Sequence, residues 1–260
     1  MEPVEASTGW GVLHLFYSVD RAAADADPGA GERIRAAIDA CTADGTHQVL
    51  TFAVLGHKAD LGVLALGPDL ARLQALQQAL AGPPLRATWS YVSLTEGSEY
   101  TSTEDDERAR LAAEEGITDP DAVEERLATW RDRMAHYREN RVHPRLPLKR
   151  TICFYPMSKR RTGDDNWYSL DFAERKALMA GHARVGRGYA GRVLQLITGS
   201  TGIDDWEWGV TLLADDPAAL KDIVYEMRFD EVSARFAEFG PFVTGLVGEP
   251  AATLAAVGLA

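Results

Sequence analysis

The sequence predicts an α+β fold made of two ferredoxin-like halves. Two observations support this prediction: the order strand-helix-strand-strand-helix-strand occurs twice along the 260 residues, and turn or cap residues separate most of the elements. Each copy of this order is typical of a four-stranded antiparallel sheet with its helices on one face. We therefore expect two similar sheets, one from each half of the chain.

In the first half, short apolar runs predict the strands, and apolar residues at three- and four-residue spacing predict the helices. Ile34 and Ile38 mark the first helix, and Leu73 and Leu76 mark the second. A turn-like segment at residues 56–60 separates the second strand from the third. The expected strands are 11–19, 49–55, 61–66 and 86–94, and the expected helices are 31–43 and 69–80.

In the second half, two capping patterns mark where the helices begin. Asp171 is followed three residues later by Glu174, which is a capping-box pattern. Asp216 is followed by Pro217, which is an N-cap with proline at the first helical position. The expected strands are 151–155, 192–198, 206–214 and 241–246, and the expected helices are 171–189 and 217–227.

A long connection joins the two halves. It is acidic at first, then helical over residues 122–137, and then bounded by prolines at 142–148, which is too long for a tight linker. Either a helical arm packed on the domains or a partly mobile loop fits this composition. The predicted division is an N-terminal domain at 1–98, a helical or loop connection at 99–149 and a C-terminal ligand-binding domain at 150–260.

The composition excludes several classes of protein. The formal net charge is −12, and no continuous basic face is visible, which argues against a general nucleic-acid binder. The first residues do not resemble a secretory signal, and no apolar run approaches the roughly 20 residues that span a bilayer. Cys41 and Cys153 have no metal-binding or CxxC spacing, so we expect two buried free thiols in a cytoplasmic protein without a membrane span.

The run from residue 151 to 161 carries polar groups in an otherwise apolar strand. Because side chains on a strand alternate faces, Tyr155, Met157 and Lys159 should point the same way. From residue 138 to 161 there are eight cations and one acid, a local reversal of the overall charge. A solvated surface arm would explain this run, but so would an anion site, since arginine binds carboxylates through paired hydrogen bonds.

His182 lies in the predicted helix 171–189, with Met179 and Val185 one turn away on either side. That spacing places His182 in an apolar, sheet-facing stripe. Glycines at 181, 186 and 188 surround it, although each costs about 1 kcal/mol relative to alanine inside a helix. A buried histidine with one hydrogen bond is one interpretation. The glycines, which leave room for a flat group, and the lack of further ligands favour a single axial ligand to a haem-like iron over a zinc site.

Gln195 interrupts an apolar strand, where an amide without partners costs about 1–3 kcal/mol. An edge-facing glutamine and a neutral donor above a bound ligand are both open. A cation, Arg228, and a hydroxyl, Ser233, follow the last predicted helix. Taken alone, this arginine is a favourable helix C-terminal charge.

These residues occur within longer motifs. The motifs are Tyr155-Pro156-Met157-Ser158-Lys159, Asn166-Trp167-Tyr168, His182 with Gly186-Arg187-Gly188-Tyr189, Gln195, Glu207-Trp208-Gly209, and Met227-Arg228-Phe229-Asp230-Glu231-Val232-Ser233. Together they resemble the coproheme decarboxylases, the haem-synthesis branch of the chlorite dismutase-like superfamily. The resemblance is dense over residues 138–248, while the first half agrees mainly in its order of elements.

The resemblance implies a fold and an assembly. The two ferredoxin-like halves form a dimeric α+β barrel, the subunits assemble as a homopentamer, and the iron site lies in the second half. His182 looks like the proximal iron ligand, for which Glu207, Asp230 and Glu231 are all candidate partners. Gln195 occupies the distal position, where true chlorite dismutases have arginine. The actinobacterial branch has a distal histidine and lacks the lysine, so this chain resembles the glutamine-type branch.

The resemblance also implies a reaction. Two propionates of Fe-coproporphyrin III (coproheme) are oxidatively decarboxylated to vinyl groups with hydrogen peroxide, which yields haem b and carbon dioxide. Tyr155 resembles the tyrosine that becomes a radical, and Lys159 the lysine beside a propionate. Transient contact with the chelatase that inserts the iron is also implied. The residues that match propionate-anchoring or pocket-lining positions are Arg141, Arg228, Ser233 and Met157.

Three other functions compete with this one. A non-catalytic haem carrier or sensor would bind haem b as tightly as coproheme. A chlorite dismutase-like haem peroxidase would share the iron site, but the glutamine at position 195 counts against chlorite chemistry. An α+β barrel monooxygenase without a cofactor would bind no tetrapyrrole at all. Lys159 and the neighbouring arginines favour the decarboxylase, because coproheme carries four carboxylates and haem b only two.

Overall fold

The structure is a computed structural model that describes residues 2–259. Its strands form one nine-stranded sheet in the order β7-β6-β4-β1-β3-β2-β9-β5-β8, and a further pairing of β7 with β5 closes the sheet into a barrel. The strands are β1 (Gly11–Val19), β2 (Gln48–Val54), β3 (Leu61–Gly67), β4 (Leu85–Thr95), β5 (Thr151–Lys159), β6 (Val193–Gly199), β7 (Trp208–Ala214), β8 (Ala237–Phe239) and β9 (Val243–Gly248).

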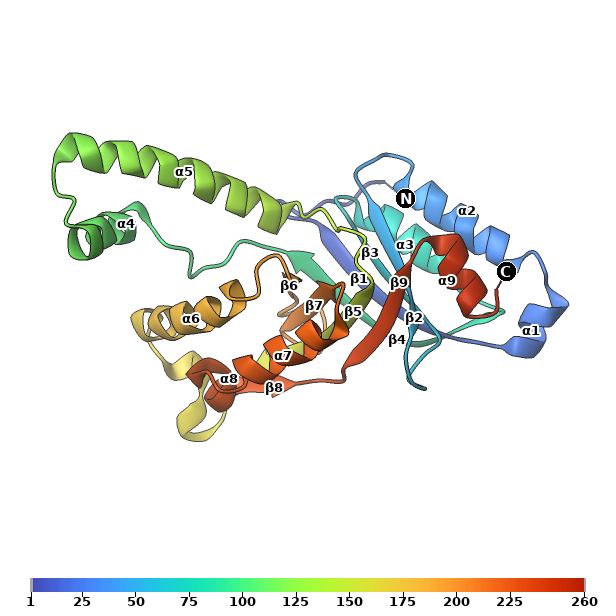
Figure 1. Ribbon diagram of the computed structural model, residues 1–260. Helices are drawn as coiled ribbons and strands as arrows, with labels where there is room; N and C mark the ends of the chain where they lie inside the picture. Colours follow the sequence, from blue (N-terminus) through green and yellow to red (C-terminus); the bar gives the residue numbers. More distant parts are fainter. Residues whose placement is uncertain (1, 260) are drawn as a thin grey trace.

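The helices lie on the outer surface of this barrel and on one projecting arm (Figure 1). None of those formed by residues 2–259 is long and apolar enough to cross a membrane. The α-helices are α1 (Arg21–Ala26), α2 (Ala30–Thr42), α3 (Leu70–Ala79), α4 (Glu104–Arg110), α5 (Pro120–Val142), α6 (Phe172–Arg187), α7 (Pro217–Met227), α8 (Glu231–Phe236) and α9 (Pro250–Ala256). A π-helical turn, Leu111–Glu115, follows α4, and two short 3-10 turns, Gly163–Asp165 and Trp167–Ser169, precede α6.

The ferredoxin-like order is present in each half, but the two sheets are not separate. The first half contributes the order β4-β1-β3-β2 and the second half β6-β7-β5-β9, all paired antiparallel. The two halves form one barrel, as the resemblance implied, because β4 pairs with β6 and β2 pairs with β9. Unpaired edge strands expose hydrogen-bonding groups, and joining the two halves at both edges satisfies them. The division at residues 98 and 149 stays a prediction.

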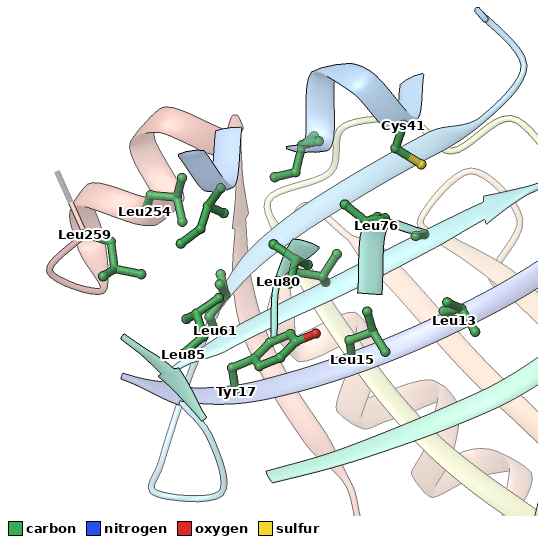
Figure 2. Packing of buried hydrophobic residues seen from close by; sticks show 14 of the residues in the cluster. Leu13, Leu15, Tyr17, Cys41, Leu61, Leu76, Leu80, Leu85, Leu254 and Leu259 are labelled. Carbon is green, nitrogen blue, oxygen red and sulfur yellow. The ribbon is translucent and has the colours of Figure 1, made fainter. Parts of the chain in front are cut away.

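The buried side chains form two layers, one inside the barrel and one between the barrel and the helices outside it. Aromatic side chains fill the barrel interior, among them Phe16, Phe52, Tyr91 and Phe154, each no more than 2% exposed. On the outside of the first half, leucines from β1 and β3 pack under α2, α3 and α9 (Figure 2). Successive residues of β1 belong alternately to the two clusters, as the period of a strand requires.

The predicted long elements agree with the structure to within a few residues, whereas several short ones were missed. The helices α1, α8 and α9 have only 6, 6 and 7 residues, too short to show a clear helical period. The predicted helix at 122–137 is the central part of α5, which is 23 residues long. Between the halves, α4 and α5 form a helical arm with a small core of its own around Leu111, Val123 and Leu127.

Candidate functional site

The outer surface of the barrel is packed differently in the two halves. In the first half, α2, α3 and α9 bury residues such as Ile34, Leu73 and Leu254 to 5% exposure or less. In the second half, α6 is 16 residues long, yet Gly186 is its one fully buried residue. The side chains of α6 are therefore less completely buried than those of the helices in the first half.

The strand β5 brings the expected polar residues to this part of the molecule. It continues through Pro156 to Lys159 without a change of register, first along β7 and then along β8. Tyr155 and Met157 belong to the outer cluster beside α7, while Phe154 faces the barrel interior. The alternation expected for Tyr155 and Met157 is therefore confirmed, and Lys159 follows at the end of the same strand.

Tyr155 is buried next to two aromatic rings. It is 4% exposed, stacks on Phe242 with ring centroids 4.4 Å apart, and lies 5.7 Å from the ring of Phe239. The guanidinium carbon of Arg228 lies 4.7 Å from the centre of the Phe239 ring. Burial raises the pKa of Tyr155, and the positive charge of Arg228 opposes this shift in part. The phenol is therefore protonated at neutral pH and lies near one cation.

Lys159 is a buried cation without a direct partner. The residue is 8% exposed, and its ammonium lies 4.7 Å from the centre of the Trp167 ring. No hydrogen bond or ion pair within residues 2–259 holds this ammonium. Burial lowers the pKa of Lys159 to about 8, against the opposing effect of the Asp230 and Glu207 carboxylates. Such an ammonium destabilises the folded protein when no anion is bound to it. It binds an anion well, because the cation has already been desolvated.

His182 is oriented by a carboxylate. Its Nδ1 lies 2.9 Å from Oδ2 of Asp230, and the two side chains are 27% and 9% exposed. Ser233 donates its backbone N–H to Oδ1 of Asp230 at 3.0 Å and its hydroxyl to Oδ2 at 3.2 Å. Burial alone would raise the pKa of Asp230, but these hydrogen bonds hold it below its ordinary value. With Nδ1 occupied, Nε2 makes no hydrogen bond in the described part of the chain and is available to a metal.

The other two candidate partners of His182 are used elsewhere. Glu207 accepts a hydrogen bond from the backbone N–H of Lys159 at 2.7 Å, which supports the end of β5. Glu231 pairs with Arg235 one turn further along α8, at 2.7 Å. The sequence left all three acids open, since only the fold decides which of them reaches the imidazole.

The expectation that His182 lies in a sheet-facing apolar stripe was wrong. The residues Leu178, Met179 and Val185 are each only half-buried, and α6 packs mainly against α8 and α7. The helical spacing was correct, but the helix stands away from the sheet along most of its length. Leu178 and Met179 instead adjoin a small cluster centred on Trp167, Val232 and Phe236.

The glycines of α6 have different roles. A Cβ on Gly186 would lie 3.2 Å from the Met227 side chain and 3.3 Å from that of Gln195, so this position is a close approach between α6 and β6. Gln195 donates from Nε2 to the carbonyl oxygen of Gly186 at 3.2 Å. A Cβ on Gly181 would meet nothing within 4 Å. Gln195 therefore contacts α6 at Gly186, one helical turn after His182, through a single hydrogen bond.

Arg141 lies at the end of α5, beside Glu96. Its Nε is buried and has no hydrogen-bond partner among the described residues. Burial raises the pKa of the neighbouring Glu96, and the positive charge of Arg141 opposes that rise. An orphaned buried guanidinium nitrogen is costly, and it is consistent with a site for an anion that is not part of the chain.

The structure thus brings most of the predicted residues into one region. Tyr155, Lys159, His182 and Arg228 are linked there by Asp230 and by aromatic contacts, and Gln195 adjoins α6. Sequence reasoning did not assign a role to Trp167, which supports the Lys159 ammonium. An aromatic eight residues from a lysine carries no local signal of this contact, because a loop and one short turn separate them.

The chain belongs to the chlorite dismutase family, since the model of that family, described as chlorite dismutase, matches residues 29–248. A coproheme decarboxylase of Thermus thermophilus is 38% identical to it over 272 residues, 99% of this chain and 98% of that protein. The resemblance found in the sequence motifs is thereby confirmed.

Other relatives agree with this assignment. The solved structure of a heme-binding protein from Thermus thermophilus is 36% identical, covers 99% of this chain and 100% of its own, and superposes with a TM-score of 0.79. A chlorite dismutase from Candidatus Nitrospira defluvii shares the fold, with a TM-score of 0.71 at 15% identity over 97% of both chains. A putative heme-binding protein of Natronomonas pharaonis is 41% identical over 96% of this chain, which spans 41% of that relative's length.

Proposed function

We propose that this chain is a hydrogen-peroxide-dependent coproheme decarboxylase that converts Fe-coproporphyrin III to haem b. The observation that carries this proposal is Lys159, a buried ammonium without a partner, next to the carboxylate that orients His182. A site for a porphyrin with few carboxylates has no need of such a cation. The relatedness to a coproheme decarboxylase over nearly the whole chain supports the same conclusion.

The residues present fit an iron porphyrin with four carboxylates. His182 offers a free Nε2 to the iron, while its Nδ1 is fixed by Asp230. Lys159 and the orphaned Nε of Arg141 are desolvated donors for carboxylates, and Arg228 is a third cation nearby. Ser233 is turned toward Asp230, so we propose that it anchors a propionate only by sharing its hydroxyl.

The proposed reaction balances with one peroxide for each propionate. Each turnover takes up one peroxide and one proton and releases carbon dioxide and two waters, as the ethyl link of the propionate becomes a vinyl group. When bound, the iron porphyrin supplies the centre at which peroxide is reduced, and it is also the substrate. Tyr155, once it has lost an electron and its phenolic proton, takes a hydrogen atom from the propionate and becomes a phenol again.

The chain's own residues prepare this step. The raised pKa of Tyr155 keeps the phenol protonated until it is oxidised, and Arg228 favours departure of the proton by its charge. Lys159 holds the carboxylate whose bond to carbon is to break. Met157 lies between the two on the same strand face. Gln195, which donates to the carbonyl oxygen of Gly186, would be a neutral donor to a bound ligand.

A titration tests the proposal directly. Purified protein is mixed with coproheme, peroxide is added stepwise, and the porphyrin is followed by absorbance and mass. We expect the loss of one carbon dioxide and two hydrogens for each of two propionates. Tyr155→Phe should bind coproheme and not convert it, while Tyr225→Phe, at an exposed position, should behave as the unmodified protein. Conversion by Tyr155→Phe at the normal rate would remove Tyr155 from the mechanism.

A haem carrier is the second candidate, favoured by relatives described as putative heme-binding proteins. It predicts equal affinity for haem b and coproheme and no change in mass with peroxide. A chlorite dismutase-like peroxidase predicts oxygen release from chlorite.

We also propose a homopentamer, a cytoplasmic location, and transient contact with the chelatase that inserts the iron. The proposed domains are 1–98, 99–149 and 150–260. Native mass spectrometry tests the homopentamer.

A further inference from the structure

Asp230 is connected to both functional ends of the site. On one side its Oδ2 accepts the hydrogen bond from Nδ1 of His182 at 2.9 Å. On the other side its charge, like that of Glu207, opposes the lowering of the Lys159 pKa that burial causes. The side chain of Asp230 is 9% exposed, so water screens neither interaction well.

The position of Asp230 explains why it can serve both residues. It is the N-cap of α8, where its Oδ1 accepts the backbone N–H of Ser233 and fixes the carboxylate. The same short helix contributes Val232 and Phe236 to the cluster that contains Trp167, and Trp167 supports the Lys159 ammonium. The carboxylate and the indole ring that supports the ammonium are therefore both held by residues of α8.

We propose that Asp230 couples the charge state of the substrate to the strength of the axial ligand. This inference rests on the proposed function and extends it. While a propionate is bound to Lys159, that anion neutralises the ammonium, and the full charge of Asp230 acts on the imidazole of His182. After the propionate has become a neutral vinyl group, the ammonium acts on Asp230 again and weakens its hydrogen bond to His182.

The consequence is a distinction between substrate and product at the iron. A stronger hydrogen bond at Nδ1 makes the imidazole a better donor to the metal through Nε2. The axial bond is therefore strongest with coproheme and weaker with haem b, which favours retention of the substrate and release of the product. Asp230 is a positioning residue in this scheme, because it acts through His182 and Lys159 and does not touch the reacting atoms.

The test measures the axial bond and needs no turnover. Anaerobic ferrous complexes with coproheme and with haem b are prepared without peroxide, and the iron–histidine stretching band is recorded by resonance Raman spectroscopy. In the unmodified protein we expect a higher frequency with coproheme than with haem b. In Lys159→Met and in Asp230→Asn the two frequencies should coincide. The matched controls, Lys221→Met and Asp222→Asn at exposed positions, should keep the difference.

A second readout separates coupling from a loss of contacts. If Lys159 served only to hold propionates, Lys159→Met would not slow the release of haem b. The coupling predicts slower release, by about tenfold, because Asp230 then acts on His182 alone. Transfer of haem b to an excess of a high-affinity apoprotein measures this rate.

The outcomes separate the two levels of the proposal. Equal bands in the unmodified protein, or a difference that persists in Lys159→Met or Asp230→Asn, would overturn the coupling and leave the proposed function standing. If coproheme gives no iron–histidine band at all, the proposed function is refuted, and the coupling with it.

Discussion

Lys159→Met should stabilise the ligand-free protein at neutral pH. Burial lowers the pKa of Lys159 from 10.5 to about 8, and each pKa unit corresponds to about 1.4 kcal/mol. The ammonium therefore costs roughly 3 kcal/mol in the folded state. Methionine retains the apolar stem but loses the cation–π contact with Trp167, about 0.5–1 kcal/mol. The expected net gain in the free energy of unfolding is about 2 kcal/mol.

The dependence on pH distinguishes this cause from better packing. Below about pH 8 both the folded and the unfolded chains carry the proton on Lys159, so the full cost is present. Between about pH 8 and 10.5 the unfolded chain holds the proton that the folded chain has lost, and stability rises with pH in this window. Lys159→Met should lack this rise.

Urea unfolding of the ligand-free proteins, at one protein concentration and a series of pH values, measures both effects. Lys221→Met, at an exposed position, is the matched control and should show neither. The reasoning is refuted if Lys159→Met is no more stable than the unmodified protein at pH 7, or if its stability rises between pH 8 and 10.5 as before.

Two further predictions follow from buried titratable side chains. Binding of coproheme near pH 9 should take up close to one proton, because the bound carboxylate raises the pKa of Lys159 from about 8. Calorimetry in two buffers of different ionisation enthalpy measures this proton uptake. An unchanged uptake in Lys159→Met would contradict the prediction. His14, which is 1% exposed and hydrogen-bonded to Thr211, has its pKa lowered to about 3 by burial, so stability should fall as the pH drops below 6.5. Replacement of His14 by phenylalanine should remove that fall, and acid unfolding followed by circular dichroism tests it.

The predictable part of this protein is local in sequence. The capping box at Asp171 and the N-cap at Asp216 are present, because the residues that make them are three positions apart or fewer. The alternation along β5 likewise depends only on the strand period. The helical spacing around His182 was read correctly for the same reason, although the face that it packs against was not.

The environment of the site depends on contacts between distant segments. The imidazole of His182 meets a carboxylate 48 positions away, and which of three acids reaches it was open in the sequence. The lowered pKa of Lys159 comes from burial beside Trp167, and no sequence pattern measures burial of that kind. The connection between the halves was likewise left open between an arm packed on the domains and a loop, and the structure shows a helical arm in which α5 packs against α4.

The sequence by itself determined the repeated order of elements, the side chains that share a strand face, and the motifs that place the chain in the chlorite dismutase family. Those features follow from spacing along the chain. The tertiary structure decided that the two halves close one barrel, that α6 stands away from the sheet, and that Asp230 is the acid that reaches His182. Each of these depends on which distant residues exclude water together, and that is settled only when the chain has folded.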